Sequence, residues 1–174
     1  GSEMCIRDSA RGGMAEVFLG EDQLLGRPVA VKVLFPEFAS DPNFVERFRR
    51  EAQAAANLSH PNIVGVFDWG KERNTYYIVM EYVEGRTLSQ IIRKEGPLPA
   101  ARVAEIADGI ASALGFAHKG NVVHRDMKSG NVIISDTGQI KVADFGIATA
   151  ISTGSDADLT HCLLYTSDAA DEAK

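Results

Sequence analysis

Apolar residues recur along this chain with two different periods, and the change between them predicts the order of its elements. Four short runs rich in β-branched and aromatic side chains predict strands, at residues 16–20, 29–32, 63–69 and 76–81. A polar turn over residues 71–75 separates the last two. A further pair of such runs, 132–135 and 139–142, flanks Asp136-Thr137-Gly138, a turn sequence that favours a hairpin.

Helical spacing first appears after the second predicted strand. Ser40 or Asp41 can cap this helix, and Pro42 suits its first turn. Its apolar positions are Phe44, Phe48, Ala52, Ala55 and Ala56. Glu51 borders that apolar face, which predicts a carboxylate pointing from the helix towards the strands.

Two more helices are predicted between residue 87 and residue 120. The first is short, over residues 87–93, and Gly96-Pro97-Leu98-Pro99 connects it to the second. The second is long and closes at Lys119-Gly120. Its expected apolar face consists of Val103, Ala107, Ile110, Ala111 and Leu114.

Polar residues that could take part in catalysis lie on both sides of the predicted hairpin. Residues 124–131 read H-R-D-M-K-S-G-N, and residues 144–146 read D-F-G. A hairpin places the loop before it and the loop after it at the same end, so Asn131 and Asp144 should lie close together. Both motifs resemble those of eukaryotic-type protein kinases, and H-R-D-x-K-x-x-N is usual in the serine/threonine branch.

This resemblance implies transfer of the ATP γ-phosphoryl group to hydroxyls of protein substrates. Asp126 would accept the proton of the substrate hydroxyl, and Lys128 would neutralise charge on the transferring group. Asn131 and Asp144 would coordinate Mg²⁺, or Mn²⁺ in its place, through hard oxygen atoms. ATP and a divalent metal ion are therefore the expected cofactors.

The resemblance also implies control by phosphorylation. Arg125 precedes the candidate base, and in this family such an arginine commonly pairs with a phosphorylated residue of the activation loop. Thr160 is favoured by position as that phosphosite, which makes the protein itself one expected substrate. The other hydroxyls in this stretch are Thr149, Ser152, Thr153 and Ser155.

The beginning of the chain resembles the end of a kinase glycine-rich loop. Residues 11–17 read R-G-G-M-A-E-V, and Gly12 matches a glycine of the G-x-G-x-x-G-x-V motif, whereas Ala10 and Ala15 replace the other two. A dinucleotide-binding turn is the alternative. It would open a helix, whereas residues 16–20 predict a strand.

Lys32 ends a V-A-V-K run that resembles the kinase element whose lysine contacts the α- and β-phosphates. Glu51 on the following helix would hold its ammonium group in place. By the same resemblance Met80 would be the gatekeeper beside the ATP site, and the backbone of Glu81 and Val83 would bind the adenine edge. The expected side chains around the ring are Val17, Ala30 and Ile133.

Both ends of the chain differ in character from the rest. Read codon by codon, residues 1–9 and 162–172 correspond to translated sequencing adapters, so both end segments, 1–9 and 162–174, are expected to be adapter-derived. Residues 10–81 would then form the N-lobe of a kinase, and residues 82–161 part of its C-lobe. A fragment that ends inside the activation loop is expected to be inactive by itself.

Composition bears on which classes of partner this chain could bind. The chain carries 24 acidic and 18 basic residues, a net charge of −6. Without the two end segments, which hold five of the acidic and two of the basic residues, the net charge is −3 and both cysteines are lost. No basic patch suggests nucleic acid and no long apolar run suggests membrane contact, so a cytoplasmic domain is expected, although its parent protein could be anchored.

The expected fold is therefore α+β and two-lobed, with a five-stranded antiparallel sheet and one long helix followed by an incomplete, mainly helical part. Similarity to bacterial kinases covers about residues 10–160. Two alternatives stay open: a pseudokinase or nucleotide-binding scaffold, and a regulatory half-domain that ends here naturally. Substitutions at Lys32, Asp126 or Asp144 would indicate the pseudokinase, and none is found.

Overall fold

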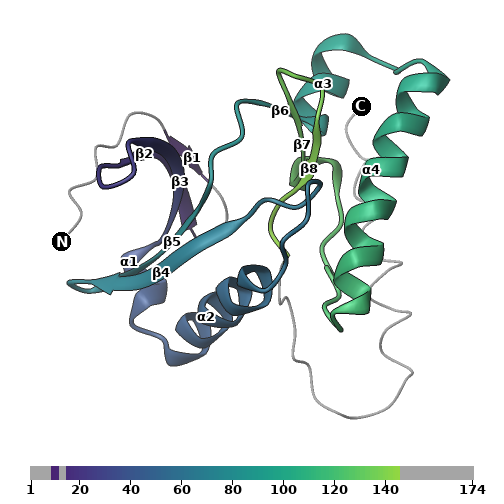
Figure 1. Ribbon diagram of the computed structural model, residues 1–174. Coiled ribbons are helices and arrows are strands. Elements are labelled where there is room, and N and C mark those ends of the chain that lie inside the picture. Colours follow the sequence, from purple (N-terminus) through teal and green to yellow (C-terminus); the bar gives the residue numbers. More distant parts are fainter. Residues whose placement is uncertain (1–8, 12–14, 146–174) are drawn as a thin grey trace, which may run out of the picture.

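A computed structural model describes residues 9–11 and 15–145, which form two sheets and the helices that pack on them (Figure 1). One sheet has five antiparallel strands in the order β1-β2-β3-β5-β4. Its strands are β1 (Ser9–Arg11), β2 (Ala15–Asp22), β3 (Arg27–Leu34), β4 (Val66–Glu72) and β5 (Thr75–Glu81). We call residues 9–81 the N-lobe. The predicted five-stranded antiparallel sheet is confirmed.

Helix α2 (Pro42–Ala56) covers one face of this sheet, after a short helix α1 (Pro36–Ala39) that the sequence pattern did not predict. Asp41 caps α2 by accepting a hydrogen bond from the Asn43 backbone at 2.8 Å. Phe48 and Ala52 are buried against Ile78 of the sheet. The predicted apolar face is thus largely correct, although Ala56 at its end is exposed.

The second part of the chain, residues 82–145, is here called the C-lobe. Its three-stranded sheet has the order β6-β7-β8. The strands are β6 (Gly85–Thr87), β7 (Val132–Ser135) and β8 (Ile140–Val142), and the helices are α3 (Leu88–Glu95), α4 (Ala100–Lys119) and the 3₁₀ turn η1 (Ser129–Asn131). The predicted hairpin is confirmed as β7–β8. Strand β6 was not predicted, and Thr87, expected inside a helix, instead caps α3.

The predicted strand over residues 63–69 is wrong at its beginning, because β4 starts only at Val66. The residues before it pair with the other lobe: Val64 N–H donates to Val142 O at 2.9 Å, and Ile63 forms a parallel bridge with Val142. Their apolar character reflects burial between the lobes and not membership of the N-lobe sheet. The predicted turn over residues 71–75 is also shorter, since β4 ends at Glu72 and β5 begins at Thr75.

The predicted apolar face of α4 is rotated relative to the observed one. Val103 is 50 % exposed, and Ala107 and Ala111 are exposed as well. The residues that α4 buries are Ile106, Gly109, Ala113 and Ala117. Ile110 and Leu114 of the predicted face are partly buried and pack against the same core, so the prediction is correct for these two residues. Three of the four buried residues are small, and Gly109 lets the helix approach Ile140 of β8 closely.

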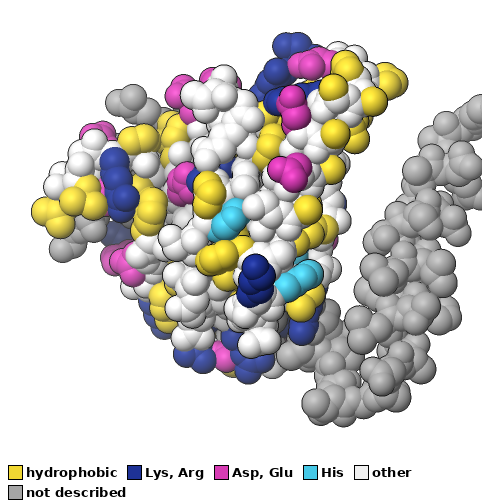
Figure 2. Space-filling view, turned by 45° about the vertical axis from the view of Figure 1, so that its right-hand side comes forward, with side chains coloured by type: hydrophobic (Ala, Val, Ile, Leu, Met, Phe, Trp, Pro, Cys, Tyr) yellow, Lys and Arg dark blue, Asp and Glu magenta, His cyan; other side chains and the backbone are white. Residues whose placement is uncertain are grey.

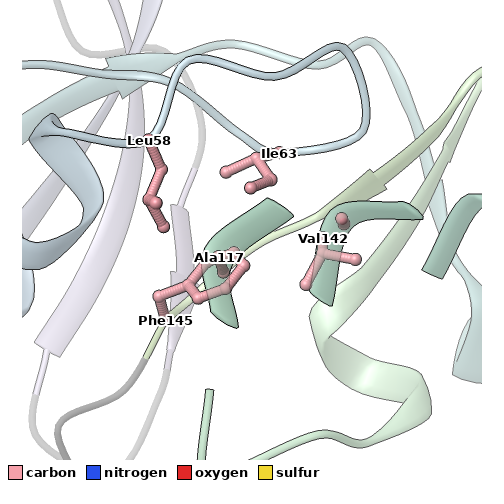
Figure 3. Packing of buried hydrophobic residues seen from close by; sticks show 6 residues of the cluster. Leu58, Ile63, Ala117, Val142 and Phe145 are labelled. Carbon is pink, nitrogen blue, oxygen red and sulfur yellow. The ribbon is translucent and has the colours of Figure 1, made fainter. Parts of the chain in front are cut away.

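The core beneath α4 includes the phenylalanine of the D-F-G motif (Figure 3). Phe145 is 2 % exposed and belongs to a cluster with Leu58, Ile63, Ala117 and Val142. These residues come from the segment after α2, from α4 and from β8. Burial of Phe145 in this cluster anchors the chain directly after Asp144.

Two glycines of α4 provide a test of this close approach. A methyl group on Gly109 would lie 2.8 Å from Cβ of Ile140, whereas one on Gly115 would meet nothing within 4 Å. We expect Gly115→Ala to raise the free energy of unfolding by about 0.5–1 kcal/mol, the gain in helix propensity. Gly109→Ala should lower it by about 1–3 kcal/mol through overpacking. Thermal unfolding checks both, and equal effects would contradict the packing of α4 on β8.

Charged side chains of both signs are interspersed on the face shown in Figure 2. Within the described residues, no helix combines the length and apolarity needed to cross a membrane. The expected adapter-derived segments, apart from Ser9 in β1, lie outside the described residues, as does most of the activation loop.

Candidate active site

Lys32 on β3 lies between two carboxylates that come from different parts of the chain. Its Nζ is 2.6 Å from Glu51 Oε1 on α2 and 3.0 Å from Asp144 Oδ1 after β8. Both contacts are hydrogen-bonded ion pairs. The structure therefore joins the sheet and helix of the N-lobe to the D-F-G motif of the C-lobe through a single ammonium group.

The environment of Lys32 keeps it charged. Burial alone would lower the pKa of Lys32, but the carboxylates of Asp144 and Glu51 outweigh burial and raise it above its ordinary value. The stabilisation that the Lys32 ammonium contributes is therefore fully present at neutral pH and is lost as the pH rises through its raised pKa in strongly alkaline solution. Burial raises the pKa of Glu51, and the Lys32 ammonium offsets part of that increase.

The H-R-D motif folds into a loop held by side chain hydrogen bonds. Lys128 Nζ lies 2.7 Å from Asp126 Oδ2. Asn131 Nδ2 donates to Asp126 O at 2.8 Å and to Asp126 Oδ2 at 3.2 Å. Asp126 remains 46 % exposed, so its carboxylate is both oriented and open to an incoming molecule.

Buried contacts behind this loop position it against the D-F-G motif. His124, 2 % exposed, donates from Nε2 to Ala143 O at 3.0 Å, and its ring packs against Phe145 with centroids 4.7 Å apart. Ala143 N–H donates to Asn131 O at 2.8 Å. The backbone at Asp144 takes a positive φ of 53°, a strained conformation for a non-glycine residue that fixed neighbours must maintain.

Asn131 and Asp144 present oxygen atoms suited to Mg²⁺. Because Asn131 uses its Nδ2 to donate to Asp126, its Oδ1 remains available as an acceptor. The Asp144 side chain is 40 % exposed, and its Oδ1 accepts a hydrogen bond from Lys32 Nζ. Mg²⁺ commonly takes one or two protein oxygens together with substrate phosphates and water. This pair fits that pattern; no larger group of metal-binding His, Cys, Asp or Glu occurs among the described residues.

The expected adenine-binding residues of the N-lobe lie on β2, β3 and the end of β5. Met80 pairs with Ala30 across β3 and β5, and Val17 pairs with Lys32 across β2 and β3. Met80 also lines a small cavity of about 20 Å³ together with Lys32 and Asp144, room for one water molecule. The structure brings these N-lobe residues onto neighbouring strands.

Five further expected residues lie elsewhere in the chain, and two of them fall outside the described residues. Val83 follows β5 in the connection to the C-lobe, and Ile133 lies on β7 in the other sheet, so a ring enclosed by Val17, Ala30 and Ile133 would lie between the two sheets. Gly12 and Thr160 lie outside the described residues. Arg125 is exposed and has a positive φ of 63°.

One charged contact near the site was not predicted. Lys141 on β8 is buried and lies 2.7 Å from Oε1 of Glu81 at the end of β5. The family resemblance implies a role for Glu81 only through its backbone, and it assigns no role to Lys141. Alternation places Lys141 on the opposite face of β8 from Ile140 and Val142, where a lysine is usually solvated. No local signal in the sequence therefore indicates this contact.

Comparison with known proteins identifies the family. The protein kinase domain matches residues 10–168. The chain is 50 % identical over 153 residues to the serine/threonine-protein kinase PrkC of Bacillus subtilis, covering 88 % of this chain and 24 % of PrkC. It is 47 % identical over 159 residues to the serine/threonine-protein kinase PknB of Mycobacterium leprae, covering 89 % of this chain and 26 % of that protein.

Solved structures agree with this match. The crystal structure of the PknI kinase domain of Mycobacterium tuberculosis superposes with a TM-score of 0.73 at 36 % identity. The similarity covers 84 % of this chain and 59 % of the PknI chain. The chain spans about a quarter of the length of the curated relatives PrkC and PknB. By sequence and by fold, the chain belongs to the protein kinase domain family.

Proposed function

We propose that the full-length protein containing this chain is a serine/threonine protein kinase that uses ATP. The observation that carries the proposal is the position of Lys32, which contacts both Glu51 and Asp144 while Asp126 stays oriented and exposed. This arrangement supports a site at which phosphates, a metal ion and an acceptor hydroxyl would meet. The names of PrkC and PknB support the serine/threonine class.

Asp126 is proposed to act as the base. Its carboxylate accepts the proton of a serine or threonine hydroxyl as that oxygen attacks the γ-phosphorus of ATP. The new O–P bond forms while the bond from the γ-phosphorus to the β–γ bridging oxygen breaks, and ADP leaves with that electron pair. Lys128, 2.7 Å from Asp126, neutralises charge on the group in transfer.

Lys32 is proposed to hold the α- and β-phosphates, with Glu51 keeping its ammonium in place. Asn131 and Asp144 are the proposed ligands of Mg²⁺ or Mn²⁺; when bound, such an ion neutralises phosphate charge and orients the leaving group. The pseudokinase alternative lacks support, because every one of these residues is retained.

The remaining assignments concern ATP binding and control. Glu81 and Val83 are proposed to bind adenine through their backbone, and the apolar side chains named above to enclose the ring. Arg125 is proposed to pair with phosphorylated Thr160, so that autophosphorylation adjusts activity. Protein substrates and the protein itself are the proposed phosphate acceptors, and the cytoplasm, where ATP is available, is the proposed location of the domain.

Metal removal tests this proposal. Full-length protein incubated with γ-labelled ATP, Mg²⁺ and dephosphorylated casein should label both itself and casein on serine and threonine. EDTA should reduce labelling by at least about a hundredfold because the phosphates lose their counter-ion, and excess Mg²⁺ or Mn²⁺ should restore it. Phosphoamino acid analysis is the measurement. Label confined to tyrosine, or no label with either metal ion, would contradict the proposal.

A further inference from the structure

Lys141 is a buried charge that the chemistry proposed above does not use. Its side chain is 8 % exposed, and it lies on β8 three residues before Asp144. The Nζ atom lies 2.7 Å from Oε1 and 2.8 Å from Oε2 of Glu81, and it donates to Ile63 O at 3.4 Å. An ammonium group removed from water needs such partners, because burying an unpaired charge is costly.

The Lys141–Glu81 ion pair spans the two lobes. Glu81 is the last residue of β5 in the N-lobe sheet, and Lys141 belongs to the C-lobe sheet. The same carboxylate accepts a hydrogen bond from Gly65 N–H at 3.0 Å, while Glu81 N–H donates to Gly65 O at 2.8 Å. Backbone and side chain of Glu81 are therefore held together, at the point where the chain passes from one lobe to the other.

Asp144 is positioned by other contacts. Ala143 just before it is held from both sides, since its N–H donates to Asn131 O at 2.8 Å and its carbonyl accepts from His124 at 3.0 Å. Asp144 itself contacts Lys32. Loss of Lys141 should consequently loosen the connection at Glu81 much more than the proposed metal ligand.

We infer that the Lys141–Glu81 ion pair is a positioning element for ATP. It holds the backbone of residues 81–83 in the conformation that binds adenine before ATP arrives. The inference rests on the proposed function, which assigns this backbone to the adenine edge. When only a fraction of the protein is in the competent conformation, the apparent affinity falls by that fraction. Loss of the pair should therefore raise the KM for ATP and leave kcat nearly unchanged.

The first test replaces Lys141 with methionine in the full-length protein. Methionine keeps an unbranched apolar stem and removes the ammonium group. We expect the KM for ATP to rise about tenfold, the change that corresponds to 1.4 kcal/mol, and kcat to change less than about threefold. Arg86→Met is the matched control, because it breaks a solvent-exposed ion pair. The side chains of Arg86 and Glu95 in that pair are 47 % and 46 % exposed. The control should alter neither quantity.

A double variant separates positioning from simple destabilisation. Lys141→Met leaves the Glu81 carboxylate without its counter-ion and should lower the melting temperature. Glu81→Gln combined with Lys141→Met removes that orphaned charge while keeping an acceptor for Gly65 N–H. Its melting temperature should recover, whereas the KM for ATP should stay raised because the lobes are still not joined by the ion pair.

Two results would overturn the inference alone: an unchanged KM for ATP in Lys141→Met, or a KM that returns to the wild-type value together with the melting temperature in the double variant. Both presuppose a wild-type protein that transfers phosphate. A wild-type protein that binds ATP but labels no protein acceptor would overturn the proposed function instead, and a measured dissociation constant for ATP would then replace KM as the readout for Lys141.

Discussion

Asp126→Asn in the full-length protein should lower kcat for phosphate transfer by about 10²- to 10⁴-fold, the usual contribution of a positioned general base. Asparagine nearly matches aspartate in shape, and its oxygen can still accept from Lys128, which lies 2.7 Å from the present carboxylate. What disappears is the negative charge that is proposed to receive the hydroxyl proton. Steady-state kinetics with labelled ATP measure the change.

Binding of Mg²⁺ and ATP should survive this substitution. Asp126 is not among the proposed metal ligands, and Asn131 can still donate from Nδ2 to the backbone oxygen of residue 126, a bond of 2.8 Å. The dissociation constant for ATP should stay within about threefold of wild type, as expected when an interaction made only in the transition state is removed.

Asp136→Asn is the matched control for the loss of an acidic group. Asp136 is exposed in the turn between β7 and β8, and its backbone N–H donates to Glu84 O. Its substitution should leave kcat unchanged. Transfer by Asp126→Asn at the wild-type rate would remove Asp126 from the role of base, whereas loss of ATP binding in that variant would show that Asp126 organises the site as a whole.

The residues of the candidate site could be found from the sequence because short motifs carry them. Asp126, Lys128 and Asn131 lie within six residues, and a hairpin of ordinary turn chemistry leads from them to Asp144. Glu51, a partner distant in the sequence, could also be predicted, since helical periodicity places it at the edge of the apolar face. The structure brings it to 2.6 Å from Lys32.

The contacts between the lobes could not be predicted from short motifs or from periodicity. Ile63 and Val64 look like the start of a strand, yet their backbone groups pair with β8, and no local pattern distinguishes those two outcomes. Helix α4 buries small residues such as Gly109 and Ala113, which contribute little to an apolar pattern. The Lys141–Glu81 pair joins residues 60 positions apart, so its formation depends on tertiary structure alone.

Lys32→Met should be as damaging as the loss of the base, through a different route. The substitution removes the ammonium group that contacts Glu51 at 2.6 Å and Asp144 at 3.0 Å, and with it the proposed partner of the α- and β-phosphates. We expect kcat/KM for ATP to fall by roughly 10²- to 10³-fold, because misplaced phosphates lose the alignment on which transfer depends. Lys94→Met, at an exposed position in the last turn of α3, is the control and should have no effect.

Glu51→Gln tests whether Glu51 acts through Lys32. The glutamine oxygen can still accept from Nζ, so the loss should be smaller, about tenfold in kcat/KM. If Glu51 only positions Lys32, the double variant Lys32→Met/Glu51→Gln should be no worse than Lys32→Met alone, because nothing remains to be positioned. Independent losses that multiply in the double variant would contradict this dependence, and full activity of Lys32→Met would exclude Lys32 from the site. Non-additivity is therefore the expected signature of the ion pair, if Lys32 contacts the phosphates as proposed and Glu51 acts only by keeping the ammonium group between α2 and Asp144.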